Sequence, residues 1–215
     1  MDTKTPQPVR HVPLWTMVLV MGGLLVYVIP GGTSYLQYDR TAILAGEWWR
    51  VVTGNWVHFS ASHLAYNLVA LGLVGWMTER SGYPHFGLLM MLSALGIGLA
   101  LLAAQPDMHF YGGLSGIATA VVVYYALWGL LEGGLWRWIC GTVLLVSAGK
   151  IILETVSGKT LLAAAGSVPF VPVPLSHLTG GLVACVAWFS MRERYPGIWC
   201  RSYMSARAVT HVTVV

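Results

Sequence analysis

Long apolar segments alternate with short polar ones along the 215-residue chain. Six apolar segments approach the roughly 20 residues that a helix needs to cross a bilayer. These segments cover approximately residues 13–30, 63–79, 84–104, 114–131, 135–153 and 175–191. Because lipid offers the backbone no water to bond, each segment is predicted to be a helix. The pattern therefore predicts an all-α polytopic membrane protein with six transmembrane helices, forming one domain over residues 1–215 with its core at about 13–191.

The composition agrees with this class. Hydrophobic residues make up 56% of the chain and charged residues only 9%, with a mean hydropathy of +0.68, whereas a soluble domain has about 25% charged residues. The net charge of +4 is therefore not interpreted as a nucleic-acid signal. Its distribution along the chain carries more information than its sum.

Most Lys and Arg residues are in segments that the predicted topology places on the same side of the membrane as the two ends of the chain. Eight are there: Lys4, Arg10, Arg80, Arg137, Arg192, Arg194, Arg201 and Arg207. Four are on the other side or at nearby helix ends: Arg40, Arg50, Lys150 and Lys159. Cytoplasmic loops are enriched in positive charge, so both termini are expected in the cytoplasm. No cleavable signal pattern precedes the first apolar segment, which we expect to be retained as a span.

Two connections on the outer side are long. The first, residues 31–62, carries Trp48, Trp49 and Trp56, and such aromatics sit well at the level of the lipid headgroups. It is predicted to be partly helical and to lie in the outer leaflet. The other, about 155–174, contains several Gly and Pro residues that break helices, and is predicted to be the more mobile of the two.

Three polar positions stand at the start of apolar segments. In the predicted topology the second, fourth and sixth spans all enter from the outer side. His63 opens the second span, Ser115 the fourth and His177 the sixth. All three are therefore expected at a similar depth, as a shared site requires.

Ser115 lies in the glycine-framed run Tyr111-Gly112-Gly113-Leu114-Ser115-Gly116. A serine is a weak nucleophile until a base takes its proton, and His63 and His177 are the candidate bases at that depth. Spans two, four and six contain no Asp or Glu there, so a Ser–His dyad is the simplest arrangement. The alternative is a helix-capping serine on a surface of small residues.

His63 and Asn67 are four residues apart and share one helix face. Both can donate hydrogen bonds to a developing oxyanion. One alternative is a polar cluster that fixes the preceding loop. Another is a metal site built from histidines, although no carboxylate, thiolate or His-x-x-x-His pair is nearby, and Cys140, Cys185 and Cys200 show no metal-binding spacing.

His177 begins the last span. An ionisable side chain inside a span is costly and suggests a function. The small residues Gly180, Gly181 and Ala184 would let this span approach the fourth one closely, and thereby bring His177 to Ser115. The alternative is a lone histidine at a helix end whose side chain reaches the surface.

These motifs follow one another in a familiar order. Trp49-Arg50, the group His58, His63 and Asn67, then Gly113-Leu114-Ser115-Gly116 and His177-Leu178-Thr179-Gly180 fall on the expected spans. Over about residues 45–190 the chain resembles the rhomboid intramembrane serine proteases. The resemblance implies that Ser115 is the nucleophile and His177 the base.

The same resemblance implies roles for the remaining residues. His63, Asn67 and the Ser115 N–H would line an oxyanion hole that Gly113 shapes. His58 and Arg50 would support the first outer loop. The loop before the last span would be the gate for substrate.

One position departs from the family pattern. Many rhomboids carry an aromatic residue one turn after the serine, where this chain has Thr119. The motifs and their flanks resemble the rhombosortase branch of bacterial rhomboids, in which a histidine is common at that position. For that branch the implied substrates end in a glycine-rich tail, a transmembrane stretch and basic residues.

The sequence therefore favours an intramembrane serine endopeptidase of the bacterial inner membrane, with its site opening to the periplasm. It would use no cofactor or metal and would cleave a membrane-protein substrate in or near a transmembrane segment. Two alternatives are a non-catalytic rhomboid-like protein that binds membrane segments and a histidine-based metal or solute transporter. No partnership with nucleic acid is expected.

Overall fold

The computed structural model describes residues 12–158 and 173–195. A long helix occupies each of the six predicted apolar segments. These helices are α1 (Leu14–Val28), α5 (Ala61–Arg80), α6 (Phe86–Ala104), α7 (Ser115–Gly129), α8 (Gly134–Ser157) and α9 (Pro174–Met191). Local signals set several of their ends: Ser60 caps α5 by accepting from the His63 N–H at 3.3 Å, and α9 begins with a proline at its first position.

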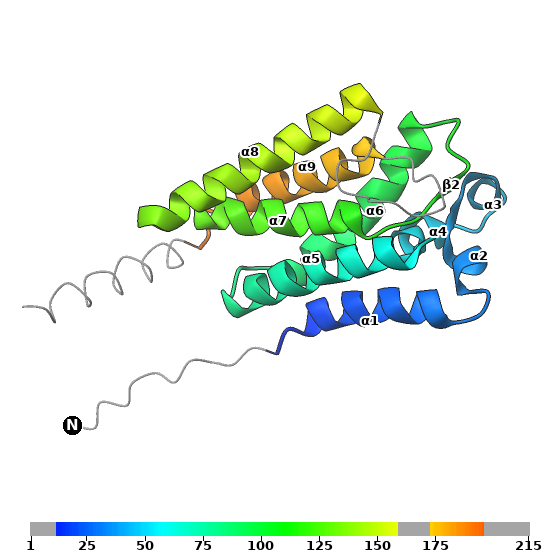
Figure 1. The fold of residues 1–215 in the computed structure, drawn as a ribbon, viewed down its shortest axis with the longest axis horizontal. Coiled ribbons are helices and arrows are strands. Elements are labelled where there is room, and N and C mark those ends of the chain that lie inside the picture. Colours follow the sequence, from blue (N-terminus) through cyan, green and yellow to red (C-terminus); the bar gives the residue numbers. More distant parts are fainter. Residues whose placement is uncertain (1–11, 159–172, 196–215) are drawn as a thin grey trace, which may run out of the picture.

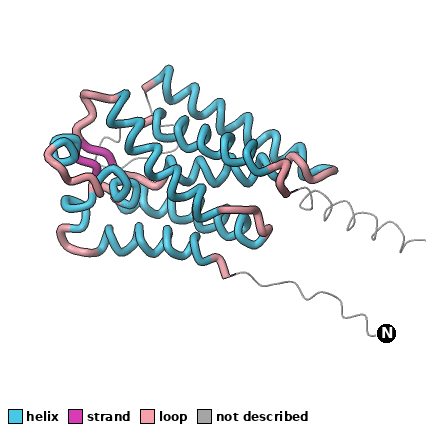
Figure 2. Tube along the Cα trace, turned by 180° about the vertical axis from the view of Figure 1, so that it is seen from behind, coloured by secondary structure: helices cyan, strands magenta, loops and turns pink. Residues whose placement is uncertain are grey.

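The first long connection, between α1 and α5, contains several short helices, in agreement with the prediction that it is partly helical. Its elements are α2 (Gly32–Leu36), β1 (Tyr38–Asp39), α3 (Arg40–Leu44), α4 (Arg50–Thr53) and the 3₁₀ turn η1 (Gly54–Trp56). Strand β1 pairs antiparallel with β2 (Phe110–Tyr111), with Tyr38 opposite Tyr111. Figure 2 shows this strand pair and the short helices at one end of the bundle. The pairing ties the first connection to the segment that leads directly into Ser115.

Helix α7 forms the centre of the bundle. It packs against α5, α6, α8 and α9, and most of its side chains are buried. Helix α1 packs on α5, and Figure 1 shows α1 and α8 on opposite outer sides of the bundle. The glycine-framed serine therefore begins the most buried of the long helices that the structure describes.

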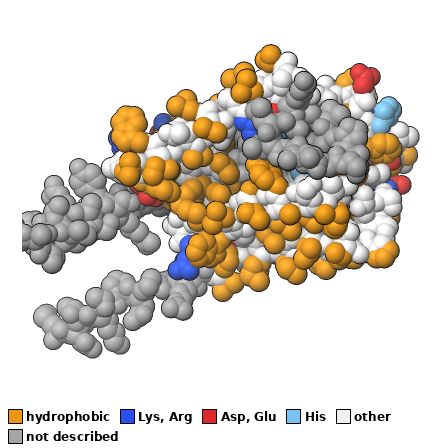
Figure 3. Space-filling model, in the orientation of Figure 1, with side chains coloured by type: hydrophobic (Ala, Val, Ile, Leu, Met, Phe, Trp, Pro, Cys, Tyr) orange, Lys and Arg blue, Asp and Glu red, His pale blue; other side chains and the backbone are white. Residues whose placement is uncertain are grey.

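The outer surface is apolar. Large hydrophobic side chains such as Leu135, Leu145, Val156 and Val69 are exposed by 70–81%, and hydrophobic atoms cover much of the face in Figure 3. Such a surface, on long apolar helices, is typical of a multi-pass membrane protein. In the described ranges, α6, α8 and α9 are long and apolar enough to cross a bilayer, the sharply bent pair formed by residues 50–56 and α5 is a fourth candidate, and α1 and α7 are shorter apolar helices. The count of six spans thus stays a prediction.

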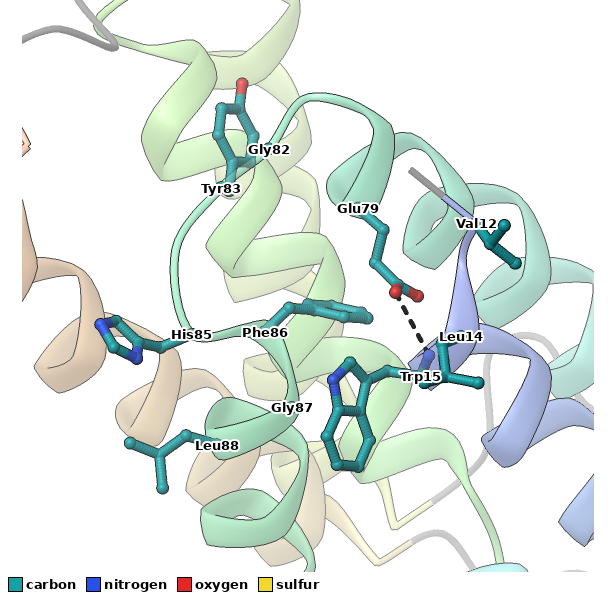
Figure 4. Close-up of a pocket in the computed structure, with 10 residues that line it drawn as sticks. All are labelled: Val12, Leu14, Trp15, Glu79, Gly82, Tyr83, His85, Phe86, Gly87 and Leu88. Atoms are coloured by element: carbon teal, nitrogen blue, oxygen red, sulfur yellow. Dashed lines mark hydrogen bonds between the residues drawn. The ribbon is translucent and has the colours of Figure 1, made fainter. Parts of the chain in front are cut away.

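Both described ends of the chain lie at one end of the bundle, and the start of α7 lies at the other (Figure 1). A cavity of about 520 Å³ opens at the end that holds the termini. There Glu79 accepts hydrogen bonds from the first turn of α1, including the Trp15 N–H at 3.2 Å (Figure 4). This cavity lies at the end of the bundle opposite the start of α7.

Candidate active site

Ser115 is the first residue of α7 and is half-buried. The N-cap residue, Leu114, offers the helix no side-chain hydrogen bond. The N–H groups of a first helical turn have no partner within the helix, and the helix dipole favours negative charge there. Thr119, one turn on, donates its hydroxyl to the Ser115 carbonyl oxygen at 2.9 Å. The Thr119 hydroxyl is thus bonded to the helix backbone.

Helices α7 and α9 cross almost backbone to backbone next to the serine. A methyl group added at Gly116 would lie 2.9 Å from the carbonyl oxygen of Ser176. A methyl group added at Gly180 would collide with the carbonyl oxygen of Gly116. The crossing point is therefore flanked by Ser115 on one helix and by His177 on the other, so the structure brings the two ends of the predicted dyad into one neighbourhood.

Gly113 brings a third predicted residue to the same place. Its φ of +149° is one that side-chain-bearing residues rarely adopt. A methyl group at Gly113 would lie 2.9 Å from Cε1 of His63 and 3.8 Å from Oγ of Ser115. The imidazole of His63 and the serine hydroxyl thus border the same small space, which a side chain at position 113 would fill.

His58 is the hub of the hydrogen bonds around this segment. Its Nδ1 lies 3.1 Å from the carbonyl oxygen of Trp56, and its Nε2 lies 3.0 Å from the Asn67 side-chain amide and 3.4 Å from the Leu114 N–H. These contacts fit a neutral ring with its proton on Nδ1, since Nε2 then accepts from both donors. His58 and Asn67 are both buried. Through these bonds, His58 and Asn67 link the segment before α5, and α5 itself, to Leu114, the residue that precedes Ser115.

Two further contacts hold the surrounding loops. The guanidinium of Arg50 donates to the carbonyl oxygens of Ser34 and Gln37 at 2.8 and 3.0 Å and pairs with Glu47. Burial raises the pKa of Tyr111 to about 12, so its phenol stays protonated and donates to the Gly113 carbonyl oxygen at 3.0 Å. Arg50 thus joins parts of the first connection, and Tyr111 fixes the backbone two residues before Ser115.

The expectation that no acidic side chain accompanies His177, the candidate base, is wrong. Glu154 of α8 places Oε2 3.1 Å from Nδ1 of His177, and Lys150 places its ammonium 2.8 Å from the same oxygen. The predicted fifth span ended at residue 153, whereas α8 continues to Ser157. The sequence did carry a signal, because Lys150 and Glu154 are four residues apart and share a helix face.

Ser115 and His177 are near each other without a direct hydrogen bond. Within residues 12–158 and 173–195, no hydrogen bond joins the Ser115 hydroxyl to His177, and no group of three His, Cys, Asp or Glu side chains is arranged to hold a metal ion. Hydrogen bonds between catalytic groups are often long without substrate and tighten when it binds. Most of the predicted gate loop, residues 159–172, lies outside the described residues.

A family model described as "Rhomboid domain" matches residues 45–194. The chain belongs to the rhomboid family. The matched range contains all seven residues predicted for the site: Arg50, His58, His63, Asn67, Gly113, Ser115 and His177. The all-α membrane bundle described above is therefore a rhomboid bundle.

Similar rhomboids include three named proteases. The chain is 34% identical over 101 residues to "Rhomboid protease AarA" of Providencia stuartii, covering 38% of this chain and 36% of that protein. It is 37% identical over 86 residues to "Rhomboid protease GlpG" of Photorhabdus laumondii, covering 39% and 29%. It is 33% identical over 69 residues to "Rhomboid protease GluP" of Bacillus subtilis, covering 32% and 14%. The matches span about a third or less of each relative's length.

Proposed function

We propose that this rhomboid is an intramembrane serine endopeptidase in which Ser115 is the nucleophile and His177 the general base. The observation that carries the proposal is the crossing of α7 and α9 at Gly116 and Gly180. This close approach supports the proposal because Ser115 directly precedes Gly116 in α7 and His177 lies one turn before Gly180 in α9. The named protease relatives support the same reaction class.

The reaction divides among a few groups. Ser115 Oγ attacks the scissile carbonyl carbon while His177 takes the hydroxyl proton, and His177 then returns that proton to the leaving amine. An acyl-enzyme remains and is hydrolysed by water with the same base.

Donors near the serine would stabilise the oxyanion. The N–H groups of the first turn of α7 supply the helix-terminal donors. His63 borders the same space, and Asn67 has a second amide hydrogen besides the one directed at His58. Gly113 leaves the room that the oxyanion needs.

The nucleophile is tested with a fluorophosphonate probe on the full chain in detergent or liposomes. Wild-type protein should be labelled, and Ser115→Ala should not. Ser147→Ala is the matched control, because that hydroxyl donates to the Val143 carbonyl oxygen within α8, and it should be labelled like wild type. Equal labelling of Ser115→Ala would remove Ser115 as the nucleophile, and an unlabelled wild type would favour a non-catalytic binding protein.

We also propose that both termini face the cytoplasm of a bacterial cell and that the site opens to the periplasm. The two ends of the described chain lie at the same end of the bundle, and Lys and Arg are in excess in the segments on that side. Both observations support this orientation. In a cysteine-free background, an impermeant maleimide should label Asp107→Cys in intact spheroplasts. Glu193→Cys should react only after lysis, and the reverse pattern would invert the topology.

The substrate class follows from the enclosed site. We propose a membrane protein cleaved in or near its transmembrane segment, and the likeness to the rhombosortase branch makes a C-terminal glycine-rich tail the first candidate. Co-expression of two reporters, one with such a tail and one with an internal transmembrane segment, should give a Ser115-dependent size shift. Cleavage of the internal reporter alone would reject the tail.

A further inference from the structure

We infer that Glu154 is a positioning residue for His177, so that the site works as a Ser–His–Glu arrangement. The inference rests on the proposed role of His177 as base. Oε2 of Glu154 lies 3.1 Å from Nδ1 of His177, and the two side chains are exposed by only 2% and 9%. The carboxylate reaches the histidine from α8, a helix that carries none of the residues predicted for the site.

The position of Glu154 is unfavourable for a buried carboxylate. It stands in the last turn of α8, where the helix dipole disfavours a negative charge. Its pairing with Lys150 runs in the order Lys then Glu, which stabilises a helix less than Glu then Lys. The rest of α8 is a largely exposed apolar surface, so a buried carboxylate on this helix calls for a specific partner.

The contact decides which ring nitrogen of His177 carries the proton. If Nδ1–H donates to Glu154, Nε2 keeps its lone pair and can take the proton of Ser115. Lys150 lies 3.4 Å from the same Nδ1, and if it donated to that nitrogen, Nε2 would carry the proton and could not act as a base. The shorter distance from Glu154 to Nδ1 and the 2.8 Å pairing of Lys150 with Oε2 favour the first arrangement.

The proton then moves in two steps that leave Glu154 unchanged. The Ser115 proton passes to Nε2 as the Oγ–carbon bond forms, and the resulting imidazolium is stabilised by the carboxylate at Nδ1. Nε2 next delivers this proton to the leaving amine as the peptide bond breaks. Lys150 offsets the charge of the buried carboxylate throughout, because an unpaired carboxylate would be costly there.

The first arm of the test observes the ring directly. Nitrogen NMR of histidine-labelled protein in micelles at about pH 8, above the usual histidine pKa of about 6.5, reports the tautomer. The signals are assigned with His177→Gln. Wild type should show the proton on Nδ1 of His177. Glu154→Gln, whose amide can donate as well as accept, should move a large share of it to Nε2, and Glu154→Asp should retain the wild-type form.

Two control variants separate positioning from structural effects. Glu132→Gln removes another carboxylate bond, from the Tyr83 hydroxyl at 2.6 Å, and should leave the His177 tautomer unchanged. Lys150→Met should also leave the proton on Nδ1. An unchanged tautomer in Glu154→Gln, or a change in Lys150→Met alone, would overturn the inference.

The second arm measures the rate of fluorophosphonate labelling. Glu154→Gln should react about 100-fold more slowly or worse, since general-base catalysis contributes about 10²–10⁴-fold, and Glu154→Asp should recover part of the rate. A wild-type rate in Glu154→Gln would reject the positioning role. If wild type itself is not labelled at Ser115, the proposed protease function fails, while the tautomer arm still decides whether Glu154 orients His177.

Discussion

The α-carbon of Gly180 in α9 lies against the carbonyl oxygen of Gly116 in α7, with no room for a methyl group between them. Small residues at such crossings let membrane helices pack closely. In this rhomboid the contact also fixes the distance between the start of α7 and the first turn of α9. Packing and the proposed chemistry therefore depend on the same pair of glycines.

Gly180→Ala should separate the two helices and reduce fluorophosphonate labelling by at least about tenfold. Overpacking of this kind costs about 1–3 kcal/mol, so thermal unfolding in detergent should also occur at lower temperature. Gly181→Ala is the matched control, because its methyl group would meet only Val123 Cγ2 at 4.0 Å. Equal labelling of both variants would show that the close crossing does not govern the site.

Gly113→Ala should reduce activity more than it reduces stability. Its methyl group would occupy the space between His63 and Ser115, and the φ of +149° adds backbone strain of order 1–3 kcal/mol. Gly46→Ala provides the control for strain alone, since Gly46 has a φ of +111° with nothing within 4 Å of the added methyl group. The labelling rate and the unfolding temperature of both variants are measured, and a loss of rate beyond that in Gly46→Ala at a similar unfolding temperature isolates the steric effect. A loss of rate equal to that in Gly46→Ala would contradict the steric explanation.

The fold was predictable from sequence because lipid leaves the backbone few options. Every predicted apolar segment is a helix, and the starts of α5, α7 and α9 lie within two residues of their predicted positions. The strand pair β1–β2 was not predicted. It consists of two residues on each side, which is too short for an alternating pattern to emerge.

The positions of candidate side chains were predictable where single residues open a span, and unpredictable where the end of a helix decided a contact. Ser115, His63 and His177 could be placed at one depth from topology alone. Glu154 was missed because the hydropathy pattern placed the end of the fifth span at residue 153. Its ion-pair partner Lys150 is on the same helix, so that pair does not indicate a contact with α9. The hub role of His58 also depends on tertiary contacts, namely its bonds to Asn67 and the Leu114 N–H, which no local pattern reveals.

His58→Ala and Asn67→Ala should not have additive effects. His58 Nε2 accepts from Asn67 and from the Leu114 N–H, so loss of His58 leaves two buried donors unsatisfied, at about 1–3 kcal/mol each. Asn67→Ala removes one donor and should cost less stability and less activity. A double-mutant cycle on thermal unfolding in detergent should give a coupling of at least about 0.5 kcal/mol. Additive effects would show that the two side chains act independently.

Glu79→Gln should weaken the attachment of α1 without changing the chemistry. The Glu79 carboxylate accepts from the Trp15 N–H at 3.2 Å, the Thr16 N–H at 2.7 Å and the Thr16 hydroxyl at 2.6 Å. It thereby satisfies donors at the N-terminus of α1, where a negative charge is favoured. Bonds to charged groups contribute about 1.5–3 kcal/mol each, and an amide replaces only part of this.

The expected result is a lower unfolding temperature in detergent with an unchanged rate of fluorophosphonate labelling at low temperature. Glu79 is in the last turn of α5, at the end of the bundle opposite the start of α7 (Figure 1). Glu193→Gln is the control, since that side chain is 86% exposed and its weak ion pair contributes little. A parallel fall in labelling rate and stability would mean that α1 and the start of α7 are coupled through α5, on which both helices pack.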